Sequence, residues 1–232
     1  MSKPCIRPGP LNSNYGTSQL PSIPVIKRGD VGLGDDTYLP VNFKQPNYKR
    51  QMIRLGTIGD GSCFFHAVLK AYYEPYASNP SYSFRTNMVR KLRNELSMVL
   101  EMINPETGLR YYDTANNGVW KELANTILLD DMNRRIDYSL RGMQRLLASN
   151  DFIGDEVFSY VADMLGIDLY VMKLDIDEIR PVIAVRKNRP AVIIGGNGVH
   201  YETLGVIRDE LIQTVFLPDD EIIPIMKCLF GE

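Results

Sequence analysis

Apolar residues recur at the three- and four-residue spacing of amphipathic helices in several stretches of this 232-residue chain. The pattern predicts helices over 63–73, about 83–103 and 155–165, and two further helices within 119–149. The residues expected to face inward are Phe64, Ala67, Val68, Ala71, Tyr72, Val89, Leu92, Leu96, Val99, Ile103, Trp120, Leu123, Ile127, Leu140, Met143 and Leu147. Each stripe needs a partner surface, so the chain is expected to build a helical layer around a core.

Strand-like runs follow the last of these helices. They cover 167–173, 181–186, 191–194 and 199–204, and short gaps separate them. Short connections favour antiparallel pairing, because parallel neighbours need a long crossover. The expected fold class is therefore α+β, with a small, mainly antiparallel sheet packed between helices.

The chain also divides by composition. Seven of the 14 prolines occur by Pro46, so residues 1–50 are expected to form an extension or a strap rather than long helices. Within this part, apolar contacts are expected from Val25, Ile26, Val31, Leu33, Tyr38, Leu39 and Val41. Residues 51–206 are expected to form one main domain, and 207–232 a C-terminal extension packed on it, as a strap or a partner surface.

Charge and cysteine content narrow the function classes. A net charge of −2 gives no general attraction to nucleic acid or anionic membranes, and no apolar run reaches the length of a membrane span. The N-terminus lacks the apolar segment of a signal peptide. The three cysteines are widely spaced, which indicates free thiols, a reducing compartment such as the cytoplasm, and no zinc site. We expect a monomer without a cofactor, in which Cys5 and Cys228 are small buried hydrophobes.

The sequence from Asp60 to Ala67, Asp-Gly-Ser-Cys-Phe-Phe-His-Ala, places a cysteine where a turn meets an apolar helix. A thiol attacks a carbonyl as thiolate, and both a helix N-terminus and an imidazolium can lower the pKa of Cys63. Asp60 or Ser62 is expected to accept a hydrogen bond from a first-turn N–H. The backbone N–H groups of Asp60, Gly61, Ser62 and Cys63 are candidates for an oxyanion hole.

The candidate bases are the chain's two histidines, His66 and His200. His66 lies on the same helix as Cys63, where it is poorly placed to protonate a leaving amine, so we expect it to be structural. His200 lies in the run Val-His-Tyr-Glu after the turn at 195–198, and strand alternation puts Glu202 roughly 6.5–7 Å away on the same face. Glu202 is thus the favoured acid to orient His200, and Asp60 the competing one.

At these residues the chain resembles the ovarian-tumour (OTU) family of cysteine deubiquitinases. The family pattern Asp-Gly-x-Cys-aromatic/Leu-Phe-Arg/His-Ala matches residues 60–67, and its His-aromatic-acidic/amide ending matches residues 200–202, with Glu in place of the commoner Asp or Asn. A third block, 152–156, lacks the family's Trp. The resemblance covers roughly residues 53–206, and its character is that of OTU proteins of large DNA viruses.

The resemblance implies a papain-like OTU fold and a thiol protease that cleaves isopeptide bonds at the C-terminal glycine of ubiquitin. It implies ubiquitin or polyubiquitin as partner, with ubiquitin-like modifiers as further candidates, and a place of action in the cytoplasm of a host cell if the chain is viral. Tyr201, Gly196, Asn197 and Gly198 are the expected walls of a narrow substrate channel. In the family the region corresponding to 119–149 often forms part of the ubiquitin-binding arm. Two alternatives remain: a cysteine protease acting on other peptide bonds, and a non-catalytic ubiquitin-binding module.

Overall fold

The computed structural model describes residues 17–19, 34–43, 45, 48–129, 133–174, 179–208 and 211–231. Cys5 and the expected strap contacts of Val25, Ile26, Val31 and Leu33 lie outside these residues. Among the described residues, none of the helices has the length and apolar character needed to cross a bilayer.

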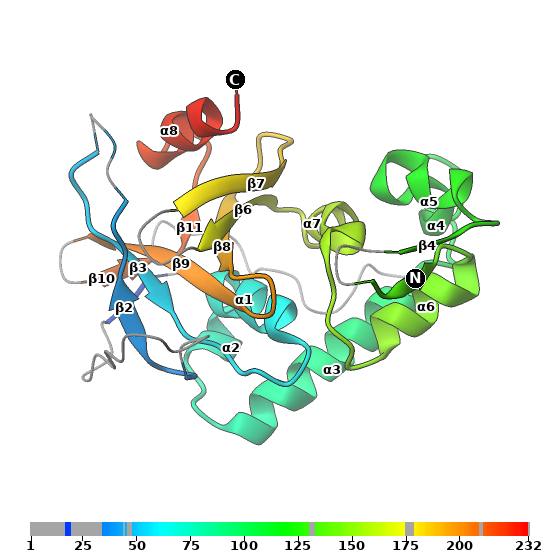
Figure 1. The fold of residues 1–232 in the computed structure, drawn as a ribbon, viewed down its shortest axis with the longest axis horizontal. Coiled ribbons are helices and arrows are strands. Elements are labelled where there is room, and N and C mark those ends of the chain that lie inside the picture. Colours follow the sequence, from blue (N-terminus) through cyan, green and yellow to red (C-terminus); the bar gives the residue numbers. More distant parts are fainter. Residues whose placement is uncertain are drawn as a thin grey trace.

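The main sheet confirms the expected α+β class. Its strands are β1 (Thr17–Gln19), β2 (Tyr38–Pro40), β3 (Met52–Leu55), β6 (Asp168–Leu174), β7 (Ile179–Val185), β8 (Ala191–Gly196), β9 (Tyr201–Arg208), β10 (Leu211–Gln213) and β11 (Val215–Phe216). They run in the order β1-β10-β9-β8-β6-β7, while β3 also pairs with β9, β2 with β3, and β11 with β8 (Figure 1). Pairing is antiparallel throughout except between β6 and β8. Strand β7 runs back along one side of β6, and β8 then pairs with the other side of β6 in the same direction as β6.

Helices cover both faces of this sheet. They are α1 (Cys63–Tyr72), α2 (Glu74–Ala77), α3 (Tyr82–Val99), α4 (Tyr111–Thr114), α5 (Val119–Glu122), α6 (Leu140–Ala148), α7 (Phe158–Leu165) and α8 (Ile222–Leu229), with 3-10 turns at Ala115–Gly118 and Asp155–Val157. Side chains of α1, α3, α6 and α7 form one core cluster with one face of β6 and β8. The opposite face packs on α8, whose buried residues are Ile222, Ile223 and Met226.

Helix α1 is the central helix of the larger cluster, and all ten of its residues are buried. The main sheet also binds its backbone. The hydroxyl of Thr203 donates to Ala67 O at 2.7 Å, and that of Thr214 donates to Ala71 O at 2.5 Å. These bonds fix the direction in which α1 points its N-terminus, and therefore Cys63.

Two other predicted helices are close to their expected bounds. The stripe of α3 buries Val89, Leu92, Leu96 and Val99, but α3 ends at Val99 and leaves Ile103 59% exposed, so the prediction for Ile103 was wrong. Helix α7 follows a 3-10 turn and ends at Gly166, whose φ of 70° makes it a left-handed cap.

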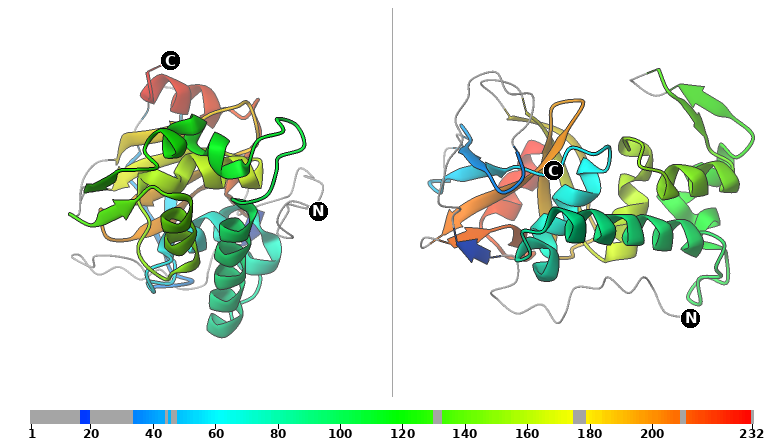
Figure 2. Two further views of the ribbon diagram at one scale, coloured as in Figure 1. Left: turned by 90° about the vertical axis from the view of Figure 1, so that its right-hand side faces the viewer. Right: turned by 90° about the horizontal axis from the view of Figure 1, so that it is seen from below.

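The prediction of two helices over 119–149 was only half right. Between the short α5 and α6 the chain forms a hairpin of β4 (Ile127–Leu129) and β5 (Arg135–Asp137). Helix α6 cannot extend back into this hairpin, because the Ser139 hydroxyl caps its start by accepting from Gly142 N. Trp120, Met143 and Leu147 are buried, whereas Ile127 is 55% exposed. Figure 2 shows the hairpin standing away from the main sheet.

The described parts of the two end segments join the same body. Strand β2 pairs with β3, and Asp35 forms ion pairs with Lys70 of α1 at 2.7 Å and Arg85 of α3 at 2.6 Å. At the other end, β10 and β11 are strands of the main sheet. Cys228 is exposed on α8, so the expectation of a buried cysteine there was wrong.

Candidate active site

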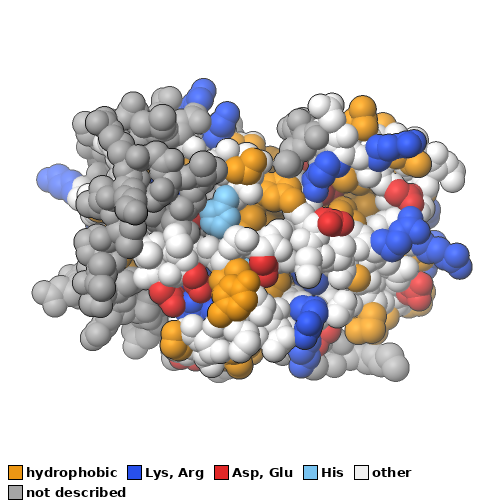
Figure 3. All heavy atoms as spheres, turned by 60° about the horizontal axis from the view of Figure 1, so that its bottom comes forward, with side chains coloured by type: hydrophobic (Ala, Val, Ile, Leu, Met, Phe, Trp, Pro, Cys, Tyr) orange, Lys and Arg blue, Asp and Glu red, His pale blue; other side chains and the backbone are white. Residues whose placement is uncertain are grey.

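Cys63 and His200, which are 137 positions apart in sequence, line one cleft of about 560 Å³. The other described residues that line it include Thr57, Gly59 and Gly61. Figure 3 shows a histidine side chain reaching the surface on this face of the molecule. Cys63 comes from the start of α1, and His200 from the turn directly before β9. The structure thus brings the expected nucleophile and base to the same opening.

The turn before Cys63, residues 60–63, is held by its own aspartate. Asp60 Oδ1 accepts from Ser62 N at 2.9 Å, and Asp60 Oδ2 lies 3.2 Å from Nε2 of His66. Ser62 occupies the N-cap position but makes no side-chain capping bond. Because the N–H groups of Ser62 and of Asp60 itself hydrogen-bond the Asp60 carboxylate, the four candidate oxyanion donors narrow to the N–H groups of Gly61 and Cys63.

Gly61 is required in this turn for two reasons. Its φ of 85° is left-handed, a region that residues with a side chain rarely adopt. A Cβ at this position would also lie 2.1 Å from Asn150 O, inside the contact distance of the two atoms. The turn therefore packs directly on the backbone of the loop that follows α6.

Cys63 is 2% exposed, and burial raises the pKa of its thiol above the ordinary value of 9.0. Backbone hydrogen bonds from Tyr201, Phe64 and Cys63 itself act in the opposite direction, and the charge of Asp60 acts in the same direction as burial. The expectation of a lowered thiol pKa is not met, since burial outweighs the hydrogen bonds.

Thr57 contacts the ring of His200. The Thr57 hydroxyl donates its proton to Tyr201 O at 2.6 Å and lies 3.3 Å from His200 Nε2. A hydroxyl carries one proton, so Thr57 accepts from Nε2–H and leaves the Nδ1 lone pair free. Burial lowers the pKa of His200 below 6.5, which keeps the ring neutral, although the charge of Glu202 acts in the opposite direction.

Glu202 lies on β9 close to His200, but its carboxylate pairs with Arg54 of β3. Arg54 Nε donates to Oε2 at 2.6 Å and Nη2 to Oε1 at 2.9 Å, and Glu202 is 1% exposed. Among the described side chains, Thr57 is the hydrogen-bonding partner of the His200 ring. This revises the expected arrangement: Glu202 acts on His200 through its charge, and Thr57 holds the ring. Threonine is common at strand ends, so no sequence signal singled out Thr57.

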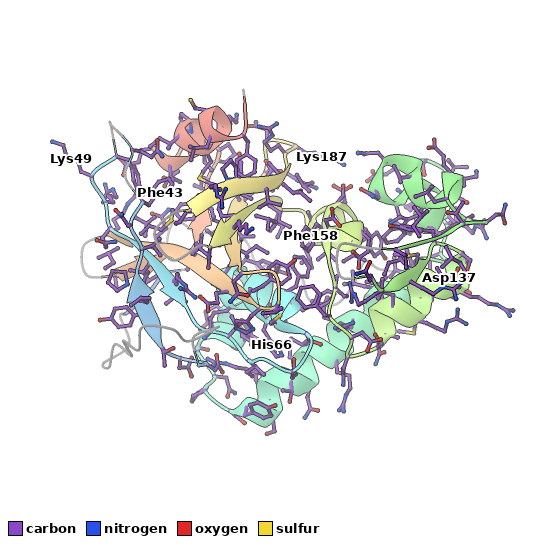
Figure 4. The ribbon with its side chains drawn as sticks, in the orientation of Figure 1. Phe43, Lys49, His66, Asp137, Phe158 and Lys187 are labelled. Carbon is purple, nitrogen blue, oxygen red and sulfur yellow. The ribbon has the colours of Figure 1, made fainter. Side chains whose placement is uncertain are left out.

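His66 is fully buried on α1 (Figure 4) and both of its ring nitrogens have partners. Nδ1 lies 2.5 Å from the Tyr76 hydroxyl, and Nε2 is the atom that approaches Asp60. His66 therefore braces the turn at 60–63 from behind, in agreement with a structural role.

A second cavity, of about 270 Å³, lies on the other side of the turn that carries His200. Tyr201, Gly196 and Gly198 line it, as does Phe152, whose ring stacks on Tyr201 at 5.4 Å between centroids. A Cβ on Gly196 would lie 2.6 Å from the Tyr201 ring, so this glycine lets the tyrosine lie flat over the strand. The stacked rings of Phe152 and Tyr201 therefore form part of the cavity wall.

Asn197 was expected to be a wall of the substrate channel, but it is not among the residues that line the second cavity. It instead shapes the turn that carries His200. Its Oδ1 accepts from His200 N at 2.9 Å and from Val199 N at 3.2 Å, and its N–H donates to His200 O at 3.1 Å. An asparagine that bonds its own turn in this way fixes the backbone locally.

No group of three or more His, Cys, Asp or Glu side chains among the described residues is arranged to hold a metal ion. No protein-family model matches the chain, and no curated protein matches its sequence.

Solved structures of OTU domains are similar to the chain. One is an OTU domain in complex with ubiquitin, with 16% identity over 84% of this chain and 91% of that chain and a TM-score of 0.48. A second is an OTU deubiquitinase from Wolbachia pipientis bound to ubiquitin, with 16% identity over 73% and 96% of the two chains and a TM-score of 0.40. A third is the viral OTU domain protease from Farallon virus, with 17% identity over 67% and 85% and a TM-score of 0.40. At these scores the overlaps describe a likeness in chain path.

Proposed function

We propose that this chain is a cysteine-dependent deubiquitinase that hydrolyses the isopeptide bond at the C-terminal glycine of ubiquitin. One observation carries the proposal of a thiol hydrolase: Cys63 at the start of α1 and His200, held by Thr57, open onto one cleft. The choice of ubiquitin rests on the resemblance of residues 60–67 and 200–202 to the OTU pattern.

The proposed mechanism begins from a neutral thiol and a neutral imidazole. Burial raises the pKa of Cys63 and lowers that of His200, and both shifts disfavour a resting ion pair. Because Thr57 accepts from Nε2–H, Nδ1 is the atom that takes the thiol proton when Cys63 attacks the glycine carbonyl. His200 is then a general base at the moment of attack.

The remaining steps use the same groups. Negative charge on the former carbonyl oxygen is stabilised by backbone N–H groups of Gly61 and Cys63. His200 returns its proton to the leaving lysine amine, which leaves ubiquitin as a thioester on Cys63. A water molecule, deprotonated by His200, attacks the thioester and releases ubiquitin with a free carboxylate. The chemistry needs neither metal nor cofactor.

Ubiquitin would be held by two surfaces, the second cavity and the β4–β5 hairpin. The cavity can take the chain end before the scissile bond, since Tyr201, Gly196 and Gly198 form its wall and Asp155 and Glu156 supply acidic side chains for a basic segment. The β4–β5 hairpin carries three apolar residues that are 43% to 64% exposed, Ile127, Leu128 and Leu129. An exposed apolar strand of this kind is suited to a protein partner.

We further propose a monomer that acts in a reducing compartment, where Cys63 stays a free thiol.

The test is incubation with ubiquitin that carries a C-terminal electrophile, followed by intact-protein mass spectrometry. A deubiquitinase becomes covalently linked through Cys63, and the link is absent in Cys63→Ala but present in the matched control Cys228→Ala. Binding without a covalent bond would identify a non-catalytic ubiquitin-binding module. No binding, combined with cleavage of an unrelated peptide library, would identify a protease of other specificity. Either result contradicts the proposal.

A further inference from the structure

Arg93 is a buried arginine of α3 whose five N–H donors are all used. Its Nε donates to Leu147 O at 2.9 Å, and its Nη2 donates to Leu146 O at 2.9 Å and to Asp151 O at 3.2 Å. Its Nη1 donates to Ser62 Oγ at 2.7 Å and to Asp151 O at 3.2 Å. One guanidinium thus joins the turn before Cys63 to the end of α6 and the loop that follows it.

The same loop presses on that turn from another direction. Asn150 O occupies the space that a Cβ on Gly61 would need. The guanidinium of Arg93 also lies 4.9 Å from the centre of the Phe65 ring. Phe65 is two residues after Cys63 on α1. Residues 61–65 are therefore confined between α3 and the segment 146–151, which comprises the end of α6 and the loop after it, and Arg93 is the side chain that spans the two.

Burying an arginine between α3 and the turn before Cys63 is unfavourable in free energy. Arg93 is 1% exposed, and its hydrogen-bond acceptors are backbone carbonyls and one hydroxyl. Burying a cation costs free energy that an apolar residue would not lose. Burial lowers the pKa of Arg93 to about 10, which still leaves it charged at neutral pH. The positive charge of Arg93 interacts electrostatically with the Cys63 thiol, so it would offset a developing negative charge on that sulfur.

We propose that Arg93 is a positioning residue of Cys63: it fixes the backbone of the turn at residues 61–62 through Ser62, and its charge stabilises the thiolate. The proposal rests on Cys63 as nucleophile, but not on ubiquitin as substrate. Other titratable groups lie around the thiol, and Asp35 and Tyr82 line the same cleft. Asp60 faces it from the turn, His66 stands behind that turn on α1, and His200 and Tyr201 approach from the side of β9.

The first measurement is the rate at which iodoacetamide alkylates Cys63 as a function of pH, in full-length protein with Cys5→Ala and Cys228→Ala so that one thiol remains. Arg93→Gln removes the charge and should move the midpoint of this profile upward by about one pH unit. Arg93→Lys keeps the charge but loses the planar fork, so its midpoint should stay near that of the parent.

The second measurement is kcat, taken with any substrate that the parent cleaves. Arg93→Lys and Ser62→Ala should each lower kcat roughly tenfold with little change in KM, because both loosen the turn that presents the oxyanion donors. The matched control is Ser97→Ala. Ser97 lies one turn further along α3 and donates to Gln144 O of α6 at 2.9 Å, so its loss weakens the same helix pair without touching the turn.

The proposal is overturned if folded Arg93→Gln and Arg93→Lys keep the parent's alkylation profile and kcat, or if Ser97→Ala changes them as much as the Arg93 variants do. Should Arg93→Gln not fold, Ser62→Ala decides, and an unchanged kcat in that variant overturns the proposal. A shifted alkylation profile in a protein that ignores the ubiquitin probe would contradict the proposed substrate and support the role of Arg93.

Discussion

Two turns meet at the cleft: the turn of Cys63, residues 60–63, and the turn of His200, residues 197–200. The first has a local hydrogen bond from Ser62 N to Asp60, but it is also held by parts of the chain that are far away in sequence, namely Arg93 on α3 and the carbonyl of Asn150. The second is held mainly by the hydrogen bonds of Asn197 within the turn. Thr57, which is distant in sequence, contacts the ring of His200. The turn of Cys63 is therefore confined by contacts from distant parts of the chain, and the turn of His200 mainly by its own hydrogen bonds.

This difference has a physical consequence for catalysis. A backbone confined on several sides cannot adapt to a change in one residue without moving its neighbours, because protein interiors are close-packed. A turn stabilised by its own side chain loses little when a neighbour outside it changes. We therefore expect mutations in the first turn to reduce both stability and activity, and mutations in the second to act mainly on activity.

The largest expected effect comes from the nucleophile itself. Cys63→Ala should reduce hydrolysis and probe labelling below detection, while the fold and the affinity for ubiquitin remain, because alanine suits a helix at this position. Enzyme assays together with circular dichroism measure both properties. Labelling that persists in Cys63→Ala and disappears in Cys228→Ala would show that the nucleophile is Cys228.

The two histidines are expected to separate activity from stability. His200→Ala should lower kcat roughly 10³-fold or more with little change in the free energy of unfolding, as for the loss of a triad member. His66→Ala should lower the free energy of unfolding by about 3 kcal/mol, since it leaves Tyr76 and Asp60 without their partner. Urea titrations and kcat measured on folded protein test the pair. The reverse ranking would assign the base to His66.

Each of the two turns contains one glycine with a positive φ, and substituting these glycines compares the turns directly. Gly61→Ala should lower the free energy of unfolding by about 3 kcal/mol or more, since the new Cβ collides with backbone in a left-handed position. Gly198 has a φ of 92° but open space around it, so Gly198→Ala should cost only about 1 kcal/mol. Equal losses in thermal and urea unfolding would contradict the difference between the turns.

The partner of the base gives a smaller effect. Thr57→Val removes the acceptor for Nε2–H and should lower kcat about tenfold, whereas Thr57→Ser should restore most of it. Glu202→Ala should act first on stability, because it leaves the half-buried Arg54 without its carboxylate. Asp60→Asn keeps an acceptor for Ser62 N–H and should retain most activity. A dead but folded Glu202→Gln beside an active Thr57→Val would return the orienting role to Glu202.

The smallest expected effect is in the pH profile of kcat/KM. The catalytic form has a neutral His200, and a lowered pKa means that this ring gains its proton only below its ordinary value of 6.5. The acid limb of the profile should therefore have its midpoint below pH 6.5, and the alkaline limb should lie above the ordinary thiol pKa of 9.0. An acid limb above 6.5, measured with a ubiquitin substrate at constant ionic strength, would show that burial does not govern the base.

Much of the site was predictable from sequence. The run at 60–67 contains a turn, a helix start and an apolar stripe, all of which are local properties, so Cys63, α1 and the bracing role of Asp60 followed from it. The strands around His200 were predictable to within a few residues for the same reason. Local pattern failed within 119–149, where Ile127, placed at helical spacing, belongs to a strand of the hairpin and is exposed.

Sequence by itself determined the candidate nucleophile and candidate base, the α+β class and most element bounds, because each depends on residues within a few positions of one another. Tertiary structure alone decided which side chain holds each of them. Thr57, Arg54 and Arg93 carry no local signal, and they reach His200, Glu202 and Ser62, respectively, only after the sheet and α3 have packed. Burial also decided the direction of the pKa shifts of Cys63 and His200, since desolvation depends on how much of the whole chain surrounds a group.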